Sequence, residues 1–390
     1  MLKYFVLHRV VWVGHGTDKK GFGLLYKEKH KEMGTANTIN QQPSQWMLGV
    51  RTALRGAGQV MFQCSSWTGL LFLAGIFWGS YECHTPQVAW GALVGLIAST
   101  ISGYLLKEKN SDGDEGLWGF NGILVGCAFP TFLANTWLMW VALIFFAMLS
   151  TWIRQGFNNV MAPWKVNSLT FPFVFLTWMF LLSTRMFDSL HPVGLSHPGM
   201  PGIEDTFALA TDFPHLVEYW LKGISQVFLV NSWVTGIFFL VGLALCNLWA
   251  AAWAAIGSAI SLGLAILFEA NPSDIANGLF GFSPVLTGIA LGMTFYSVNW
   301  KTALWAIFGI AATFFIQAGM DVIVEPWGIP TLTGPFCVAT WLFLLPLYQF
   351  GGGIKDFTRW RARVKVLQDE VDSDLTKDVD EIEEKIENKV

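Results

Sequence analysis

Residues 59–76 read QVMFQCSSWTGLLFLAGI, and residues 226–243 read QVFLVNSWVTGIFFLVGL. Two further pairs of strings match in the same order: GLWGFNGILVG (116–126) with GLFGFSPVLTG (278–288), and SLTFPFVFLTW (168–178) with TLTGPFCVATW (331–341). The offsets between the matched strings are 167, 162 and 163 residues, so they stay nearly constant over more than a hundred residues. Such self-similarity indicates that the chain contains two copies of one structural unit.

Each copy contains long stretches of apolar residues. The chain has 390 residues, of which 53% are hydrophobic and 13% charged, whereas soluble domains carry roughly a quarter charged residues. Runs without charged residues or His lie at about 60–79, 88–106, 117–134, 135–152 and 169–184, and again at about 226–245, 246–268, 278–297, 302–318 and 332–350. Each run reaches or approaches the roughly 18 residues that mark a membrane-spanning helix. These lengths predict an all-α polytopic membrane protein built from two five-helix halves.

The odd number of runs in each half predicts how the copies are oriented. If every run crosses the lipid bilayer, the second copy enters it upside down, and the chain forms an inverted repeat around a central pore. The predicted inner segments are basic, with Lys107, Lys109, Arg154, Lys165, Lys301, Lys355, Arg359, Arg361, Arg363 and Lys365. The predicted outer segments are acidic, with Glu82, Asp188, Glu204, Asp205, Asp212, Glu218, Glu269, Asp274, Asp321 and Glu325. This distribution predicts a protein of the plasma (inner) membrane with both termini in the cytoplasm.

Polar segments divide the chain further. The predicted parts are an N-terminal extension (1–45), a first transmembrane repeat (46–184), an extracytoplasmic linker with an interfacial helix (185–225), a second transmembrane repeat (213–350) and a cytoplasmic tail (351–390). The extension contains a second possible start at Met33. Residues 366–390 hold 10 acidic and 3 basic side chains, with apolar residues three and four apart between them. This spacing predicts an amphipathic helix, either solvated or in a short coiled coil.

Titratable residues are missing from the predicted spans. None of the seven His, and no Asp, Glu, Lys or Arg, falls inside them. Proton relays and ion pathways place such groups within the membrane, so the pattern predicts an uncharged solute and no ion coupling. The sequence has no HExxH or GxSxG motif, and its five Cys show no paired spacing. We therefore expect no enzyme activity, no metal site, no cofactor and no nucleic-acid partner.

The last apolar run of each half carries a matched proline. The strings are Thr170-Phe171-Pro172-Phe173 and Thr333-Gly334-Pro335-Phe336. Proline removes an amide donor and interrupts a helix, which is tolerated at membrane depth where the backbone lines a polar cavity. One such proline would indicate only a kink. Two at matched positions predict discontinuous or re-entrant helices at a permeation site.

The glycine-rich strings supply candidate wall residues. Phe120 lies one helical turn before Leu124, and Phe282 lies one turn before Leu286. Close helix packing through the glycines is the simpler explanation for such strings. Because the pattern is duplicated, it also favours paired aromatic walls, which would suit a flat solute.

Gln59 and Gln226 begin the matched first runs of the two halves. A glutamine buried near lipid is costly unless its amide finds hydrogen-bonding partners. An interfacial glutamine satisfied by water is one interpretation. The repeat favours another, in which each glutamine stands at one mouth of a pore.

These strings resemble the urea transporter family, which carries an LPxxTxPF signature once in each half. The matching stretches are VNSLTFPF at 166–173 and IPTLTGPF at 329–336. The first departs from the signature at its Leu-Pro start, and the second has Ile in place of Leu. The block GFNGILVG at 119–126 is also similar to the family, and the resemblance covers about 45–350.

The resemblance implies a homotrimeric channel with a urea pore in each subunit. In that family, aromatic and aliphatic side chains form narrow slots that stack against planar urea, and oxygen atoms along the slot edges accept its amide hydrogens. Carried over by position, the entrances would be flanked by Gln59, Phe62, Gln226 and Leu229, the slot walls formed by Phe120, Leu124, Phe282 and Leu286, and midplane hydroxyls offered by Thr170 and Thr333. Such an uncharged slot can replace the hydration shell of urea and not that of an ion.

The predicted function is therefore passive, facilitated diffusion of urea and small amide analogues across the plasma membrane. Another small-solute channel, for ammonia, water or formate, is an alternative, although the absence of His from the predicted spans argues against ammonia. An ion-coupled secondary transporter is also compatible with an inverted repeat. A membrane enzyme or scaffold would show no solute flux.

Overall fold

The computed structural model describes residues 45–106, 113, 115–195, 198 and 208–350. The chain divides into two units, Met1–Met47 and Leu48–Val390, and the second holds nearly all of the described residues. The predicted N-terminal extension and acidic tail lie outside the described residues, as do Lys107, Lys109, Glu204 and Asp205. The description below concerns the second unit.

Most of the described chain is helical. The helices are α2 (Gln45–Gln59), α3 (Ser66–Glu82), α4 (Pro86–Leu105), α5 (Phe120–Phe132), α6 (Trp137–Met161), η2 (Ala162–Trp164), α7 (Phe171–Ser183), η3 (Thr184–Met186), α8 (Phe213–Ser225), η4 (Gln226–Phe228), α9 (Trp233–Cys246), α10 (Leu248–Leu267), α11 (Pro272–Ala276), α12 (Phe282–Ile289), the π-helical η5 (Ala290–Thr294), α13 (Trp300–Val324), η6 (Glu325–Trp327) and α14 (Gly334–Leu344). Within these described residues, the extended pairing consists of one isolated bridge between Leu133 and Pro192. The all-α prediction is confirmed.

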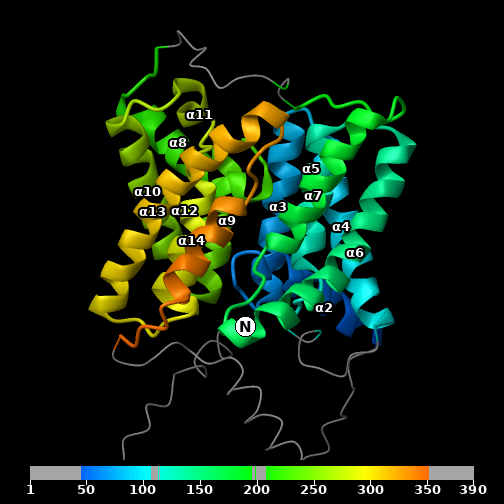
Figure 1. Cartoon of the computed structure of the whole chain (residues 1–390), viewed down its shortest axis with the longest axis horizontal. Helices are drawn as coiled ribbons and strands as arrows, with labels where there is room; N and C mark the ends of the chain where they lie inside the picture. The colour runs from blue at the N-terminus through cyan, green and yellow to red at the C-terminus, as the bar shows by residue number, and fades with distance from the viewer. Residues whose placement is uncertain (1–44, 107–112, 114, 196–197, 199–207, 351–390) are drawn as a thin grey trace, which may run out of the picture. The chain divides into compact units, whose positions relative to one another are not determined.

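Helices α3 to α7 gather on one side of this unit and helices α8 to α14 on the other (Figure 1). The matched strings begin α3 and α9 in the same way, because a serine accepts a hydrogen bond from the backbone three residues later. Ser65 Oγ accepts from Thr68 N, and Ser232 Oγ accepts from Thr235 N. Equivalent residues therefore set the same helix start in both halves.

Reciprocal hydrogen bonds join α3 to α9. Thr68 Oγ1 donates to Gly242 O at 2.9 Å, and Thr235 Oγ1 donates to Gly75 O at 2.7 Å. Each threonine and each glycine is the sequence match of the other, at the offset of 167 residues. A Cβ on Gly75 would lie 2.8 Å from Phe238 Cβ, so a small residue is needed where the helices approach.

The ten apolar runs do not all form helices long enough to cross a membrane. Among the described residues, four helices are long and apolar enough to cross a membrane, and a pair bent by 72°, Phe213–Phe228 with Trp233–Cys246, could make a fifth span. The run at 117–134 contains the 13-residue α5, and the run at 278–297 contains the eight-residue α12 followed by η5. Hydropathy counts apolar residues and does not register that a glycine-rich turn precedes each of these helices.

Three charged residues lie in the parts of two helices that extend beyond the predicted spans. The runs at 135–152 and 302–318 belong to the 25-residue helices α6 and α13, which contain Arg154, Lys301 and Asp321. A helix of that length measures about 37 Å, which exceeds the roughly 30 Å of the hydrocarbon core. These three residues thus lie on helices and outside the apolar runs themselves.

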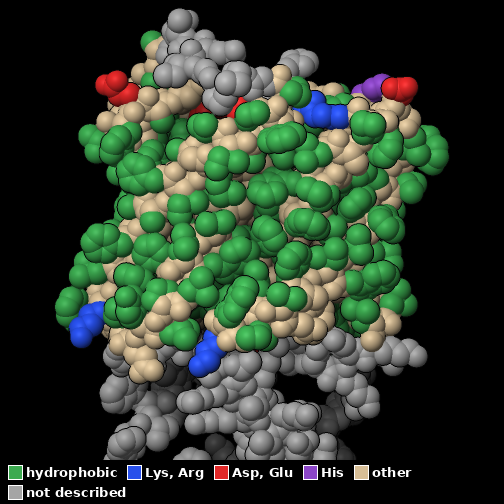
Figure 2. All heavy atoms as spheres, viewed as in Figure 1, with side chains coloured by type: hydrophobic (Ala, Val, Ile, Leu, Met, Phe, Trp, Pro, Cys, Tyr) green, Lys and Arg blue, Asp and Glu red, His purple; other side chains and the backbone are tan. Residues whose placement is uncertain are grey.

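The surface of the described helices is apolar around its middle. Figure 2 shows hydrophobic side chains over most of one face, with acidic, basic and His side chains near its two ends. Large exposed residues include Trp67, Trp137, Phe145, Leu248 and Phe308. A surface of this kind is stable in lipid, and the protein is a multi-pass membrane protein.

Two glycines with left-handed backbone hold the turns before α5 and α12. Gly116 has φ +80° and Gly278 has φ +71°, and an added Cβ would collide with the backbone nitrogen of Gly56 and of Gly223, respectively. We expect Gly116→Ala and Gly278→Ala each to cost about 2 kcal/mol or more of stability, since strain and a backbone clash combine. Thermal unfolding of the purified protein in detergent measures the effect.

Gly156→Ala provides the matched control. Gly156 lies in α6, and nothing stands within 4 Å of an added Cβ. Alanine is the better helix former, so the control should unfold at the wild-type temperature or above it. Equal unfolding temperatures for all three variants would contradict the role of the two turns.

Candidate functional site

The matched proline strings form the beginnings of two buried helices. Thr170 and Thr333 are the N-cap residues of α7 and α14, and each proline stands in the first turn. Proline fits there because the first turn of a helix has amides without intrahelical partners. The prolines therefore begin helices, which corrects the expectation that they interrupt them. The chain reverses just before each helix, with Leu169 at φ 53° and Leu332 at φ 52°.

The two N-cap threonines meet. Thr170 Oγ1 lies 2.7 Å from Thr333 Oγ1, and each residue is 3% exposed. Thr170 Oγ1 also lies 3.4 Å from Cys337 Sγ on α14. A hydroxyl has one donor and two acceptor positions, so this pair can bind a polar neighbour while it stays hydrogen-bonded internally. The contact joins the two halves of the chain at neutral polar groups.

Two tryptophan indoles form hydrogen bonds in the same region, and we call these two contacts the indole clamps. Trp178 Nε1 donates to Pro330 O at 2.7 Å, and Trp341 Nε1 donates to Asn167 O at 2.9 Å. Each tryptophan lies on the helix of one half, and each carbonyl belongs to the signature stretch of the other half. The two contacts are reciprocal at the offset of 163 residues. They hold the helix starts in register with each other.

The structure puts one predicted entrance residue beside this region. Phe62 has φ 63°, and its ring lies edge-on to Phe295 and Phe336, at centroid distances of 5.8 and 6.1 Å. Phe336 lies three residues after Thr333. Leu229 matches Phe62 in sequence, has the same left-handed backbone at φ 56°, and packs partly buried against the core. Phe62 is thus brought close to the start of α14.

The predicted wall residues lie on α5 and α12. Phe120 and Phe282 are the first residues of these helices, and Leu124 and Leu286 follow one turn later with no exposed surface. Phe120 is 7% exposed and Phe282 is partly buried. All four belong to, or pack against, the main hydrophobic core.

Asn121, which the sequence analysis did not select, ties α5 to α7. Its Oδ1 accepts from Phe173 N in the first turn of α7 at 3.2 Å, which leaves its Nδ2 without a partner among the described residues. The sequence match of Asn121 is Ser283, whose buried hydroxyl also lacks a partner there. The same holds for the hydroxyls of Thr177 and Thr340, which match each other. The sequence signal that could have identified these residues is the presence of polar residues at matched positions of the two copies.

The predicted glutamines are partly buried and hydrogen-bonded. Gln59 Nε2 donates to Glu115 O at 2.8 Å, and Gln226 Nε2 donates to Asn277 O at 2.9 Å. Glu115 and Asn277 precede the matched turns at Gly116 and Gly278. Within the described structure, neither glutamine is hydrogen-bonded to the threonine pair.

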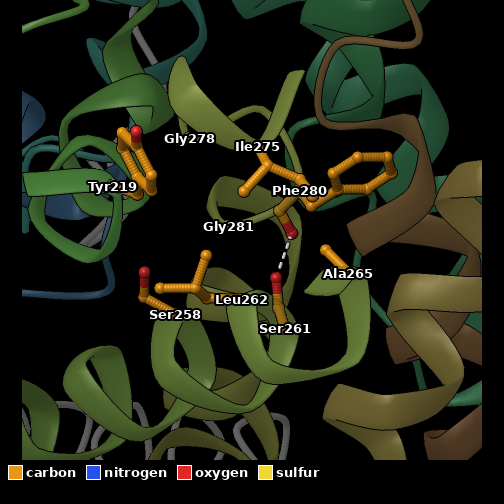
Figure 3. A pocket seen from close by; sticks show the side chains of 9 residues that line it. All are labelled: Tyr219, Ser258, Ser261, Leu262, Ala265, Ile275, Gly278, Phe280 and Gly281. Atoms are coloured by element: carbon orange, nitrogen blue, oxygen red, sulfur yellow. Dashed lines mark hydrogen bonds between the residues drawn. The ribbon is translucent and has the colours of Figure 1, made fainter. Parts of the chain in front are cut away.

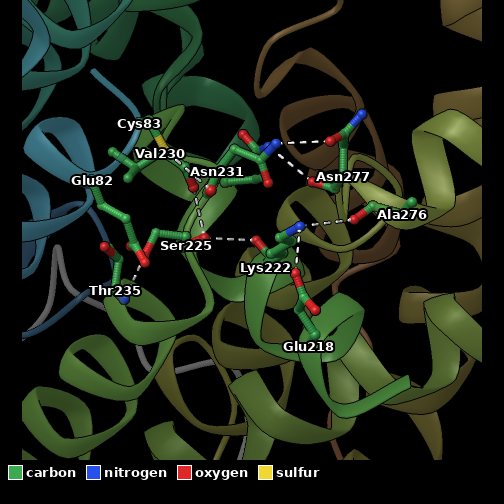
Figure 4. Close-up of polar contacts among 12 residues, drawn as sticks. Glu82, Cys83, Glu218, Lys222, Ser225, Val230, Asn231, Thr235, Ala276 and Asn277 are labelled. Carbon is green, nitrogen blue, oxygen red and sulfur yellow. Dashed lines mark hydrogen bonds and ion pairs between the residues drawn. The ribbon is translucent and has the colours of Figure 1, made fainter. Parts of the chain in front are cut away.

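Further polar groups surround Asn277 (Figure 4). Asn231 Nδ2 donates to Asn277 Oδ1 at 2.7 Å. Lys222 pairs with Glu218 at 2.8 Å and donates to Ala276 O at 3.4 Å. The amide of Gln226 thus lies in a polar neighbourhood, which fits a residue near the surface of the membrane.

A small cavity lies elsewhere, between α8, α10 and the turn before α12 (Figure 3). Its lining includes Tyr219, Ser258 and Phe280, and Ser261 Oγ donates to Phe280 O across it. The volume of about 10 Å³ is enough for one water molecule at most. None of the predicted site residues lines it, so it is not the candidate site. No group of three or more His, Cys, Asp or Glu within the described chain could hold a metal ion.

Comparison with known proteins gives consistent matches. A family model described as "Urea transporter" matches residues 50–348, which include every predicted site residue. The chain is 30% identical to Urea transporter 1 of Ovis aries and of Capra hircus over 318 residues, which are 80% of this chain and 80% of each relative. It is 30% identical to Urea transporter 1 of Mus musculus over 298 residues, or 75% of each chain.

The indole clamps give a testable consequence. In Trp178→Phe the ring volume is largely kept, but the carbonyl of the partly buried Pro330 loses its donor. Trp341→Phe removes the donor from the carbonyl of Asn167, an exposed residue that water can reach. Trp178→Phe should lose about 1 kcal/mol of stability and Trp341→Phe less, which the unfolding temperature in detergent measures. Trp137→Phe is the control, because Trp137 is 72% exposed on α6. Unfolding temperatures that match the control would show that the clamps contribute nothing.

Proposed function

The chain belongs to the urea transporter family, as its two signature stretches predicted, and from this premise we propose that it is a passive channel for urea and small amide analogues. The observation that carries the proposal is the contact between Thr170 and Thr333. There the starts of two matched helices meet through neutral hydroxyls in the interior of the protein. A solute crossing between the halves at this point would be recognised by hydrogen bonding without charge.

Urea suits such groups. It carries amide donors and a carbonyl acceptor in one plane, and a threonine hydroxyl can serve either. The unpartnered polar atoms of Asn121, Ser283, Thr177 and Thr340 support the proposal, because buried polar groups are normally paired. Polar atoms left over at matched positions of both halves are available to water or to a passing solute.

The proposed walls are the apolar residues of α5 and α12. Phe120 with Leu124 and Phe282 with Leu286 would form two slots, with Phe62 and Leu229 at their entrances and Gln59 and Gln226 at the mouths. The proposal is supported by the duplication of these residues and by the hydrogen bond that fixes α5 against α7 through Asn121. An apolar slot would favour a flat solute and disfavour a hydrated ion.

We also propose that the two halves form an inverted repeat, with discontinuous helices around the pore. Reciprocal contacts support this, because a two-fold relation converts each contact of one half into its partner in the other. Examples are the bonds between Thr68 and Gly242 and between Thr235 and Gly75. The indole clamps follow the same rule.

The proposal includes a homotrimer in the plasma (inner) membrane, with one pore in each subunit and both termini in the cytoplasm. The family resemblance supports the trimer. The charge distribution supports the orientation, since Lys165 and Lys301 belong to the predicted inner segments and Glu82 and Glu269 to the predicted outer ones. No described feature specifically favours ion coupling or catalysis.

Urea flux into proteoliposomes tests the proposal directly. Stopped-flow measurements should give fast urea entry that is unchanged by a proton or sodium gradient, because no coupled ion is involved. In Thr170→Val and Thr333→Val, urea flux should fall about tenfold, as expected when a buried hydrogen-bonding group is lost.

Thr170→Ser and Thr333→Ser are the matched controls, because serine keeps the hydroxyl, and both should conduct urea nearly as well as wild type. Flux that appears only with an ion gradient would replace the channel by a coupled transporter. Equal flux in the valine and serine variants would remove the threonine pair from the pathway.

The slot walls make a separate prediction. Phe120→Ala and Phe282→Ala should raise the permeability of a bulkier analogue, methylurea, relative to urea by about fivefold, because each removes an aromatic face. The measured quantity is the ratio of the two permeabilities. Phe145→Ala is the control, since Phe145 is exposed on the outer surface of α6. A ratio that stays at the wild-type value in both wall variants would contradict the slot assignment.

A further inference from the structure

A buried cation lies against one of the proposed slot walls. Arg154, on α6, is 5% exposed, and its guanidinium carbon lies 5.7 Å from the centroid of the Phe120 ring. Charged residues in membrane-spanning helices are costly, and those that persist commonly have a function. The proposed permeation mechanism has so far given Arg154 no role.

The second half has a different residue at this point. At the offset of 163 residues, Arg154 corresponds to Gln317 on α13, which is 2% exposed. Gln317 Nε2 donates to Leu279 O, three residues before Phe282. Among the described residues, the cations that lie over aromatic rings are Arg154 over Phe120 and Lys301 over Trp300. In the first half, therefore, the cation Arg154 lies over the wall residue Phe120. In the second half, the amide of Gln317 is hydrogen-bonded to the backbone that precedes Phe282.

The end of α6 is also fixed to the segment that precedes Phe120. Thr151, three residues before Arg154, donates from Oγ1 to Trp118 O and to Ser99 O, both at 3.1 Å. Helix α6, which carries the guanidinium, is thus hydrogen-bonded to the backbone of Trp118, two residues before Phe120. A planar guanidinium over an aromatic face restricts both groups, more so when water is excluded.

We propose that Arg154 is a positioning residue that holds the Phe120 ring and thereby contributes to the selectivity of the first slot. The inference rests on the proposed function, because it takes Phe120 to be a slot wall. Arg154 itself need not touch the solute. It acts through the orientation of the ring, whereas the ring of Phe282 is positioned by packing and by the backbone before it.

The test is the permeability ratio of methylurea to urea in proteoliposomes. Arg154→Gln installs the residue that the second half uses, and the ratio should rise about fivefold, since the contact that orients the ring is lost. Arg51→Gln is the control, because it removes one positive charge from an exposed position on α2. It should keep the wild-type ratio.

A double variant tests whether Arg154 acts through the ring. In a Phe120→Leu background, Arg154→Gln should change the ratio little further, because residues that act through each other are not additive. An additional rise as large as that in the wild-type background would overturn the proposal, since Arg154 would then act independently of Phe120.

The remaining outcomes separate the two proposals. If wild type conducts urea and Arg154→Gln keeps its ratio, the positioning role fails and the channel stands. If wild type conducts no urea, both fail. If Arg154→Gln does not fold, Arg154→Lys replaces it: lysine keeps the charge but not the planar group, so the ratio should rise by an intermediate amount, and an unchanged ratio contradicts the role.

Discussion

The structure depends on satisfying the backbone at two helix starts that lie inside an apolar protein. The first amides of a helix have no intrahelical partners, and lipid offers none, so each must be removed, paired or shielded. In α7 and α14 the prolines remove one donor each, and Asn121 accepts from Phe173 N. The indoles of Trp178 and Trp341 satisfy carbonyls in the stretch leading to the opposite helix. The indole contacts and the threonine pair lie where the halves meet, so contacts that support the buried helix starts also join the two copies.

Small residues make this arrangement possible elsewhere in the fold. The turns at Gly116 and Gly278 pass directly against the backbone of Gly56 and Gly223, so two segments approach to a distance that no side chain permits. Within a membrane, association between helices relies on close packing and hydrogen bonds, because lipid is as apolar as the helix surface. The threonine bonds between α3 and α9 serve the same purpose. The duplicated glycines and threonines therefore lie where segments contact each other closely, which explains why both copies of the unit contain them.

Much of this could be predicted from the sequence, because a residue that recurs at the same position in both copies is marked as important for the structure. The helices follow the apolar runs, and the two threonines of the signature were expected to offer hydroxyls at the midplane. The shortness of α12 was missed, and at α5 a half-span could not be told from a full span, since an apolar run has the same hydropathy whether it crosses the membrane or turns within it. Arg154 was assigned to an inner segment and its burial was not predicted, because that burial results from tertiary packing against Phe120 that no local pattern encodes. Asn121 was passed over as part of a glycine-rich string, although its amide is what fixes α5 to α7.

The backbone contacts of the two halves are more alike than the side chains at their matched positions. Asn121 is matched by Ser283, Arg154 by Gln317 and Glu115 by Asn277, so the two halves carry different groups at matched positions. In a pump, such asymmetry could be coupled to a driving force and set a direction. A passive channel cannot use it that way, because at equal concentrations the forward and reverse fluxes must be equal whatever lines the path. What asymmetry can change is occupancy: each half can bind the solute with its own strength and reject competitors with its own stringency. Unequal side chains on a duplicated backbone therefore tune selectivity at one end without imposing direction, and half-specific substitutions such as the exchange of Arg154 for glutamine are the natural way to separate the two ends.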